Sequence, residues 1–315
     1  MSESNKMFFI HCQSPVHVGT GQGVGIIDMP IMRERVTSWP LVPGSSIKGV
    51  LREYCTLLAK DHRGNEMVDV AFGKVSESRS ESADSTSAGS LAFTDGRMLA
   101  FPVASGYGTF AYVSCPMALR RLLRDSSAAG LFIGGLDQEL INQWESILRE
   151  QGDGSPALIG KQANNVLVSN KKIYVDEFEF SVKEDGRLID CIEELSQLIF
   201  EDDISQSLFN ERFMLVSDDA FQYFVTICCE TVPRIRIKHE TKTVDEGALW
   251  YEEYLPVESI LYGIAWCDKV HIKGSTIRAE EMFAPFSPSV KLQIGGNASV
   301  GKGRISCRFT GGVAK

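Results

Sequence analysis

The sequence predicts an α+β fold, because segments with the period-two alternation of strands are interspersed with segments of helical period. Residues 7–12 (MFFIHC) form a short apolar run that is typical of a buried strand. Residues 47–60 (IKGVLREYCTLLAK) carry apolar side chains at helical spacing. Residues 233–239 (PRIRIKH) alternate polar and apolar positions, and residues 248–256 (ALWYEEYLP) follow as a second strand, which predicts a long β-hairpin.

The first half of the chain sets the order of the elements. Pro43-Gly44-Ser45-Ser46 supplies an N-cap for the first helix. Residues 89–104 predict a strand, an Asp-Gly turn and a second strand, and residues 109–115 a further strand before a helix over 116–125 that opens with proline. The early order of strand, helix, strand, strand, helix, strand is that of a ferredoxin-like or RNA-recognition-like domain with insertions. The expected buried face of the first helix comprises Ile47, Val50, Leu51, Tyr54, Leu57 and Leu58.

The rest of the chain is predicted to complete a single domain. Residues 76–90 are polar and of low complexity, which predicts a flexible surface loop. A mixed insertion is expected over about 116–230, with a strand at 171–182 and a helix at 192–200. Strands at 259–267, 289–296 and 304–309 close the fold, and the last two flank a glycine-rich loop at 294–304.

Bulk properties limit the classes of function. The chain is 43% hydrophobic and 23% charged, as expected for a soluble globular protein. Its net charge of −9 argues mildly against a generic nucleic-acid binder, unless the basic residues are clustered. The eight cysteines form no CxxC or zinc-type spacing, which favours reduced thiols in the cytoplasm. No stretch of eighteen apolar residues is present, so we expect no membrane span.

Two glycine-rich segments resemble nucleotide-binding loops without matching them. Gly296-x4-Gly301-Lys302-Gly303 lacks the Ser or Thr that holds Mg²⁺ in a P-loop, and the chain ends too soon for an NTPase. The glycines at 19, 21, 23 and 25 lead into a segment with three prolines, which excludes the helix of a dinucleotide-binding turn. The alternative for the C-terminal loop is a plain turn between two strands.

Basic residues cluster beside these loops, the first helix and the hairpin. Any one of them can be an ordinary solvated charge, but together they predict contacts with a phosphate backbone. A helix N-terminus and glycine loops let phosphates approach main-chain N–H groups. The predicted contact residues are Arg33, Arg35, Ser45, Ser46, Lys48, Arg52, Arg234, Arg236, Lys238, Gly295, Gly296, Gly301, Lys302, Gly303 and Arg304.

Asp28 is the leading candidate for chemistry, because it follows the glycine run in a loop that cannot be helical. A carboxylate near phosphates can bind a divalent cation or take a proton from a 2′-hydroxyl, although capping a turn is the alternative. His17 lies in the same segment and can transfer protons, or be structural. Glu252 and Tyr254 share one face of the returning hairpin strand, where packing is the competing explanation.

These residues together resemble the RAMP superfamily. Residues 17–53 resemble its N-terminal signature, and residues 294–304 (IGGNASVGKGR) its C-terminal glycine-rich loop. Residues 25–35 (GIIDMPIMRER) combined with 246–256 (EGALWYEEYLP) are narrower and resemble the subunit-four family of the Cmr complex, the type III-B CRISPR effector backbone. The resemblance covers both ends and the hairpin and is weak over about 116–230.

The resemblance implies an RRM-like palm and a thumb hairpin at 233–256. It implies an RNA-guided endoribonuclease of antiviral defence, whose copies stack along a CRISPR RNA with other Cmr subunits and cut single-stranded target RNA at regular intervals. It assigns cleavage to Asp28, with His17, Glu252 and Tyr254 near the site. The implied reaction needs Mg²⁺ or Mn²⁺ at Asp28 and leaves a 2′,3′-cyclic phosphate. The alternatives are a type III-A (Csm) backbone subunit, a non-catalytic RNA-binding scaffold, or a metal-free RNA-processing RAMP nuclease.

Overall fold

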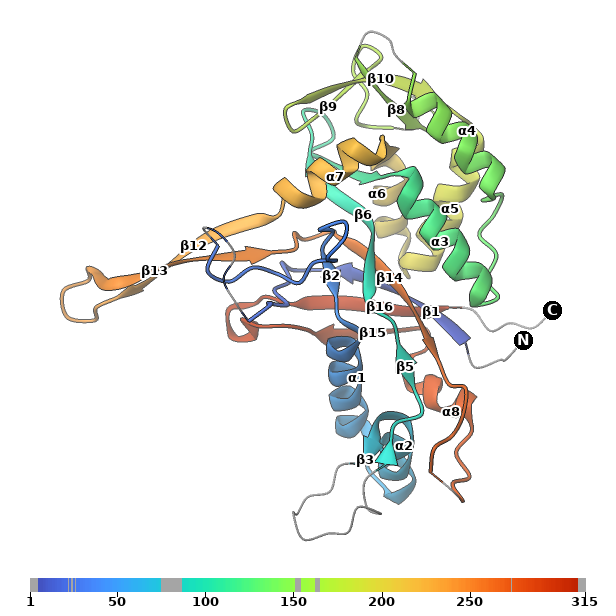
Figure 1. Cartoon of the computed structure of the whole chain (residues 1–315), viewed down its shortest axis with the longest axis vertical. Helices are drawn as coiled ribbons and strands as arrows, with labels where there is room; N and C mark the ends of the chain where they lie inside the picture. Colours follow the sequence, from blue (N-terminus) through green and yellow to red (C-terminus); the bar gives the residue numbers. More distant parts are fainter. Residues whose placement is uncertain are drawn as a thin grey trace.

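The apolar run expected from the sequence forms β1 (Asn5–Cys12), an interior strand of the main sheet. Its residues 7–10 are buried on both faces of the sheet, which explains why they do not alternate. β14 (Ile260–Trp266) and β16 (Arg304–Thr310) pair antiparallel with its two edges, so both ends of the chain build the palm (Figure 1). The computed structural model describes residues 5–310 except 22, 24, 26, 75–86, 151–153, 162–164 and 273.

The described residues form a twelve-stranded main sheet. Its strand order is β15-β16-β1-β14-β6-β7-β11-β8-β10-β9, with β2 paired to β6 and β5 paired to β14. β3 (Gly73–Lys74) and β4 (Ser87–Ala88) pair separately. The other strands of the main sheet are β2 (Leu41–Val42), β5 (Ala92–Phe93), β6 (Gly96–Ala104), β7 (Phe110–Ser114), β8 (Ser155–Ile159), β9 (Lys172–Val175), β10 (Phe178–Glu184), β11 (Phe213–Leu215) and β15 (Ser289–Gln293).

Helices cover both faces of the palm. The alternate residues of β1 point into two cores: Phe8 and Ile10 pack with the helix at 44–58, whereas Met7 and Phe9 pack with the helices of the insertion. None of the helices in the described residues is both long enough and apolar enough to cross a membrane. The helices are α1 (Gly44–Leu58), α2 (His62–Phe72), α3 (Pro116–Ala128), α4 (Gln138–Leu148), α5 (Arg187–Ile199), α6 (Asp203–Arg212), α7 (Asp218–Ile227) and α8 (Ala279–Phe283), with 3₁₀ turns η3 (Ala284–Phe286) and η4 (Ala298–Val300).

The insertion between β7 and the hairpin carries the acidic excess of the chain. Residues 116–230 contain 21 Asp and Glu against 10 Lys and Arg, whereas the remaining residues contain 20 against 22. In Figure 1 the insertion forms the upper part of the molecule, above the palm strands and α1. The palm and hairpin are therefore close to neutral, despite the net charge of −9 for the whole chain.

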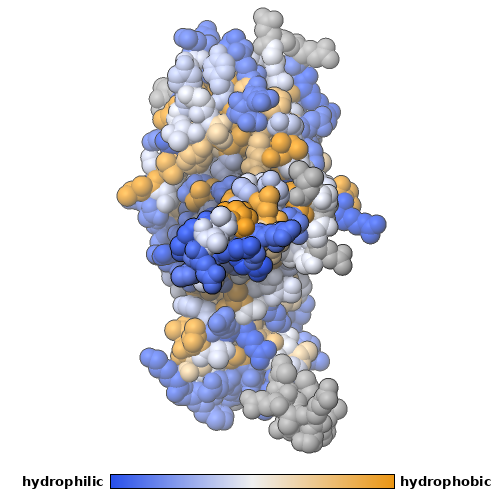
Figure 2. Space-filling model, turned by 90° about the vertical axis from the view of Figure 1, so that its left-hand side faces the viewer, coloured by the Kyte–Doolittle hydropathy of each residue, from blue (hydrophilic) through white to orange (hydrophobic). Residues whose placement is uncertain are grey.

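The predicted protruding hairpin is confirmed as β12 (Glu230–Ile237) and β13 (Val244–Tyr254), which form a separate two-stranded sheet. It extends sideways from the palm in Figure 1. Alternation gives it two faces: Arg234 lies opposite Trp250 on one, and Ile235 lies opposite Leu249 on the other. The second face is apolar and exposed, and Figure 2, in which the hairpin points toward the viewer, shows hydrophobic side chains next to hydrophilic ones.

Several predicted details were wrong for identifiable reasons. The Asp-Gly turn does not join a hairpin, because β5 and β6 both pair with β14 and not with each other. Asp95 instead accepts the Gly44 N–H at 2.8 Å, so α1 begins at Gly44 with a carboxylate at its N-terminus and without a serine cap. Leu57 and Leu58, which were expected on the apolar face of this helix, are exposed at its C-terminal end.

Two further elements differ from the prediction. The strand predicted over 171–182 is the β9–β10 hairpin, because Asp176 takes a left-handed conformation between them. The helix α2 was not predicted at all, although Asp61 caps it through the N–H of Gly64. The loop predicted over 76–90 lies outside the described residues up to position 86, and residues 87–88 form β4.

Candidate functional site

Four segments that are distant in sequence meet at the base of the hairpin. Val16 pairs with Leu255, and Met29 pairs in parallel with Glu252. The glycine-rich loop joins them through the Gly296 N–H, which donates to the carbonyl of His17 at 2.8 Å. The segments that carry His17 and Asp28, which were predicted to take part in chemistry, are therefore neighbours of the hairpin strand and the C-terminal loop.

Asp28 lies on a segment that runs beside β13 and pairs with the edge of β13 that does not face β12. The Met29 N–H donates to the Tyr251 carbonyl and the Glu253 N–H donates to the Met29 carbonyl, both at 3.0 Å. The carboxylate of Asp28 accepts the Tyr251 N–H at 2.8 Å through Oδ2. The side chain is exposed, and its second oxygen has no hydrogen-bond partner among the described residues. One oxygen therefore orients Asp28, and the other faces solvent or substrate.

His17 is buried with one ring nitrogen committed to structure. Its side chain is only 4% exposed and packs against the Tyr254 ring, with the ring centroids 5.5 Å apart. Nδ1 lies 2.7 Å from the Glu253 carbonyl, so Nδ1 carries a proton and donates it. In the neutral ring Nε2 is then an acceptor. A Cβ on Gly19 would lie 2.7 Å from Nε2, so the glycine keeps the space in front of this nitrogen open.

Glu252 accepts more hydrogen bonds than any other carboxylate in the site. It is 3% exposed and receives Trp250 Nε1 at 2.8 Å, Asn297 Nδ2 at 3.0 Å, Arg234 Nε at 3.1 Å and the hydroxyl of Tyr254. Burial acts to raise the pKa of Glu252, but the bonds from Tyr254 and Trp250 and the charge of Arg234 outweigh it, so this pKa lies below its ordinary value. Glu252 is thus a fixed anion that organises its neighbours, and a poor proton acceptor.

Tyr254 is held as a donor beneath the glycine-rich loop. Burial, followed by the bond to Glu252, raises the pKa of Tyr254 to about 12, so the phenol keeps its proton at neutral pH. The ammonium of Lys302 lies over its ring, 4.8 Å from the centroid. Among the described residues no hydrogen bond joins Asp28 to His17, Glu252 or Tyr254, so the four predicted residues share the hairpin base without forming one catalytic contact.

Two of the predicted basic contact residues are turned inward. Arg33 donates to Glu253 Oε1 at 2.6 Å and to the carbonyls of Ser38 and Val225. Lys48 donates to the Leu91 carbonyl at 2.7 Å, and burial, with help from nearby Arg52, lowers its pKa. Both cations are therefore engaged in contacts within the fold, and their sequence context alone does not distinguish them from surface charges.

Other predicted contact residues remain accessible. Arg236 and Lys238 project from the hairpin and share Asp245 as a partner, while Arg234 reaches back to Glu252. Ser45 is exposed at the start of α1, and Ser46 and Arg52 are half-buried on the same helix. Arg35 is exposed in a turn after the Asp28 segment, Arg304 is exposed at the start of β16, and Lys302 of the glycine-rich loop lies over the Tyr254 ring.

The glycines of the C-terminal loop serve different needs. Gly295 and Gly303 have φ of +80° and +81°, and a Cβ would lie 2.2 Å from the His17 carbonyl oxygen and 2.1 Å from that of Ile294. These two glycines allow the chain to pack against itself. Gly301 also has φ of +80°, but a Cβ there would meet open space, and Gly296 would meet only ordinary contacts. The close approach of phosphate is therefore possible at Gly301 and Gly296.

Gly295→Ala is expected to lower the free energy of unfolding by about 2 kcal/mol or more, since left-handed strain adds to the clash with the His17 carbonyl. Gly301→Ala is the matched control, because Gly301 has the same φ but a Cβ there meets no clash, and the substitution should cost about 1 kcal/mol. Urea unfolding of both variants measures the difference. Equal losses would show that packing against His17 is not the reason for Gly295.

Sequence reasoning missed three residues of this site. Asn297 has a left-handed backbone (φ 62°) and bonds to the hairpin, and Trp250 and Glu253 hold Glu252 and Arg33. The sequence offered only weak signals for them. Asn297 is an asparagine within a glycine-rich loop, and Trp250 and Glu253 are one aromatic and one acidic residue on a strand. Their partners are distant in sequence, so only the folded chain identifies their roles.

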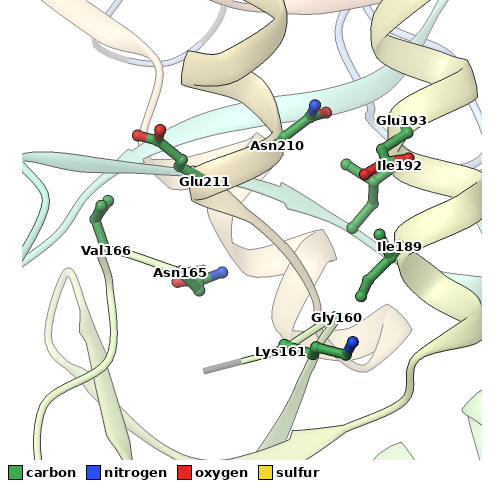
Figure 3. A pocket seen from close by; sticks show the side chains of 9 residues that line it. All are labelled: Gly160, Lys161, Asn165, Val166, Ile189, Ile192, Glu193, Asn210 and Glu211. Atoms are coloured by element: carbon green, nitrogen blue, oxygen red, sulfur yellow. The ribbon is translucent and has the colours of Figure 1, made fainter. Parts of the chain in front are cut away.

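A cavity of about 490 Å³ lies elsewhere, within the insertion (Figure 3). Its walls come from the chain after β8, from α5 and from α6, and none of the predicted site residues lines it. A second cavity of about 460 Å³ flanks the Asp28 segment. The lining of the second cavity includes Thr20, Ile27, Pro30, Ile31, Arg33, Ser38, Thr226 and Glu253.

The chain has a palm built from both of its ends, a free-standing hairpin and a glycine-rich loop at the base of that hairpin. These features define one class of protein, and comparisons with known proteins agree on it. The sequence model of the RAMP superfamily matches residues 9–306. The chain is 32% identical to the CRISPR system Cmr endoribonuclease Cmr4 of Pyrococcus furiosus over 297 residues, covering 94% of this chain and 92% of that protein. The chain therefore belongs to the RAMP superfamily and, within it, to the Cmr4 family.

Solved structures of Cmr4 and of a Cmr complex share the fold. The crystal structure of oligomeric Cmr4 from Pyrococcus furiosus has a TM-score of 0.67 at 22% identity and covers 100% of both chains. A chain of the type III-B Cmr-beta complex bound to cognate target RNA has a TM-score of 0.67 at 21% identity, covering 97% of this chain and 96% of that chain. The predicted α+β class is confirmed.

Proposed function

We propose that this chain is the backbone subunit of a type III-B CRISPR effector complex and an endoribonuclease within it. It binds CRISPR RNA as a filament of its own copies, together with other Cmr subunits, and cleaves complementary target RNA in the cytoplasm. The observation that carries the proposal is the Asp28 segment, which is paired to the edge of β13 at the base of a free-standing hairpin. The identity of 32% over 94% of the chain supports the type III-B assignment over the type III-A alternative.

Asp28 is the residue that we assign to the reaction, because its free carboxylate oxygen is exposed at the edge of the hairpin. The 2′-oxygen of the target attacks the adjacent phosphorus, and the bond from phosphorus to the 5′-oxygen breaks. The products are a 2′,3′-cyclic phosphate and a 5′-hydroxyl. One proton leaves the 2′-hydroxyl and one is delivered to the 5′-oxygen. Asp28 can take the first, and solvent water can supply the second. His17 Nε2 is a further atom able to exchange a proton.

The hairpin supplies the geometry that this reaction needs. In-line attack requires the 2′-oxygen, the phosphorus and the leaving oxygen to align, and a regular duplex prevents this. The exposed apolar face around Ile235 and Leu249 is suited to displacing a base pair. The 460 Å³ cavity beside the Asp28 segment provides room for a nucleotide turned out of the duplex. Cleavage would then recur once per subunit along the filament.

A divalent cation, Mg²⁺ or Mn²⁺, is part of this proposal. Among the described residues there is no group of three or more His, Cys, Asp or Glu side chains arranged to hold an ion, and Asp28 offers one free oxygen. This donor set fits an ion held by one carboxylate together with waters and RNA phosphates. Such an ion, when bound, neutralises charge on the scissile phosphate.

Lys302→Ala is expected to weaken guide RNA binding several-fold and to reduce the slope of log affinity against log salt by about 0.7, as for one lost phosphate contact. The cleavage rate of the complexes that still form should not change. Lys183→Ala is the control, because Lys183 lies in the acidic insertion and pairs with Glu150. Filter binding over a salt series measures both variants, and an unchanged slope for Lys302→Ala would contradict the assignment.

A further inference from the structure

The glycine-rich loop is attached to the hairpin by the side chain of Asn297. Its Nδ2 donates to Glu252 Oε2 at 3.0 Å and to the hydroxyl oxygen of Tyr254 at 2.8 Å. Both acceptors are on the same face of β13 and are hydrogen-bonded to each other, so the amide nitrogen serves the two atoms together. The loop that is proposed to hold guide phosphates and the strand that holds Asp28 are therefore linked through one amide group.

The backbone at this position shows that the side chain is needed. Asn297 has φ of 62° and ψ of 26°, a left-handed conformation that glycine adopts without cost. Glycine occupies the left-handed positions Gly295, Gly301 and Gly303 of the same loop. Asparagine tolerates this conformation better than most residues, but less well than glycine. Its presence here is explained by the two hydrogen bonds and not by the backbone.

The two bonds also set the direction of the hydrogen-bond network. Because Asn297 donates to the Tyr254 oxygen, the Tyr254 proton is directed to Glu252. Glu252 lies opposite Met29, whose neighbour Asp28 is held by the Tyr251 N–H on the same strand. A displacement of Glu252 would thus move the strand edge that orients the Asp28 carboxylate.

We propose that Asn297 is a positioning residue for RNA cleavage, which fixes the spacing between the guide-holding loop and the Asp28 edge of the hairpin. This inference rests on the proposed function. Asn297 does not touch the reacting atoms in this role; it acts through Glu252 and Tyr254. Its loss should leave guide binding intact and reduce the rate of the chemical step.

Asn297→Gly is the sharpest variant, because glycine keeps the left-handed backbone and removes only the amide. Asn170→Gly is the matched control, since Asn170 is an exposed asparagine with a left-handed backbone (φ 52°) in the insertion, outside the guide-holding loop. Each chain is assembled with guide RNA into the complex, and single-turnover cleavage of saturating labelled target is measured. We expect at least a tenfold lower rate for Asn297→Gly, guide affinity within twofold of wild type, and wild-type behaviour for Asn170→Gly.

The pH profile separates positioning from general loosening. Glu252 loses a donor in Asn297→Gly, so its carboxylate becomes easier to protonate and the acid limb of the rate profile moves to higher pH. A merely structural effect lowers the rate equally at every pH. A wild-type rate, a parallel loss of guide affinity, or a uniform loss at all pH values would each overturn the inference. Cleavage by the Asp28→Asn chain is measured in the same experiment. If that chain still cleaves, the proposed function fails, and this outcome is distinct from a failure of the inference about Asn297.

Discussion

Asp28→Asn is expected to abolish cleavage of target RNA while leaving the fold and the binding of guide and target intact. The asparagine carbonyl oxygen can still accept the Tyr251 N–H, so the segment remains paired to β13. The amide cannot take a proton and is a weak ligand for a cation, which removes both roles open to Asp28. Loss of a general base costs about 10²–10⁴-fold in rate. Gel analysis of labelled complementary RNA with the assembled complex measures the effect.

The control for this experiment is Asp245→Asn. Asp245 is also a carboxylate of the hairpin, but it pairs with Arg236 and Lys238 away from the base, so its loss should leave cleavage near wild type. Cleavage by Asp28→Asn at the wild-type rate would refute the assignment of Asp28. A wild-type chain that binds but never cleaves would favour the non-catalytic scaffold. Persistent cutting in EDTA would remove the cation from the proposal.

Glu253→Ala is expected to lower the free energy of unfolding by about 3 kcal/mol, the largest stability effect that we expect in the site. Its carboxylate is buried, at 5% exposure, and accepts Arg33 Nη2 at 2.6 Å and the Ile31 N–H at 3.0 Å. Removing it leaves a partly buried guanidinium and a backbone N–H without their anion. The carbonyls of Ser38 and Val225 still accept from Arg33, which keeps the loss at the lower end for a buried pair. Urea unfolding measures the change.

The same pair tests how Arg33 is used. If Arg33 stabilises the fold, Arg33→Ala lowers stability and leaves the salt dependence of RNA binding unchanged. If it contacts phosphate, the salt slope falls by about 0.7 and stability changes little. A double-mutant cycle with Arg33→Met and Glu253→Leu measures the coupling between the two side chains. A loss below about 1 kcal/mol for Glu253→Ala would refute the role of this pair in holding the Asp28 segment.

Local patterns in the sequence were sufficient for several elements. The apolar run of β1, the alternation of β12 and β13, and the proline that opens α3 each follow from interactions within a few residues. Asp28 was also identified locally, because prolines and glycines around it exclude a helix. The hairpin predicted from the Asp-Gly turn was wrong, because the contact of Asp95 with α1 and the pairing of β5 with β14 join residues that are distant in sequence.

The sequence by itself determined the fold class, the free-standing hairpin and the candidate residues, since periodicity, turn residues and family motifs are local signals. Only the tertiary structure decided what those residues do. Arg33 and Glu253 lie 220 positions apart, and Asn297 meets Glu252 across 45, so no local pattern predicts either contact. Burial then makes each contact matter, because a charge or amide removed from water must find its partner within the fold. Because of that requirement, Glu252 is a fixed anion. Asp28 lies at the exposed edge, and one of its carboxylate oxygens has no hydrogen bond from the described residues.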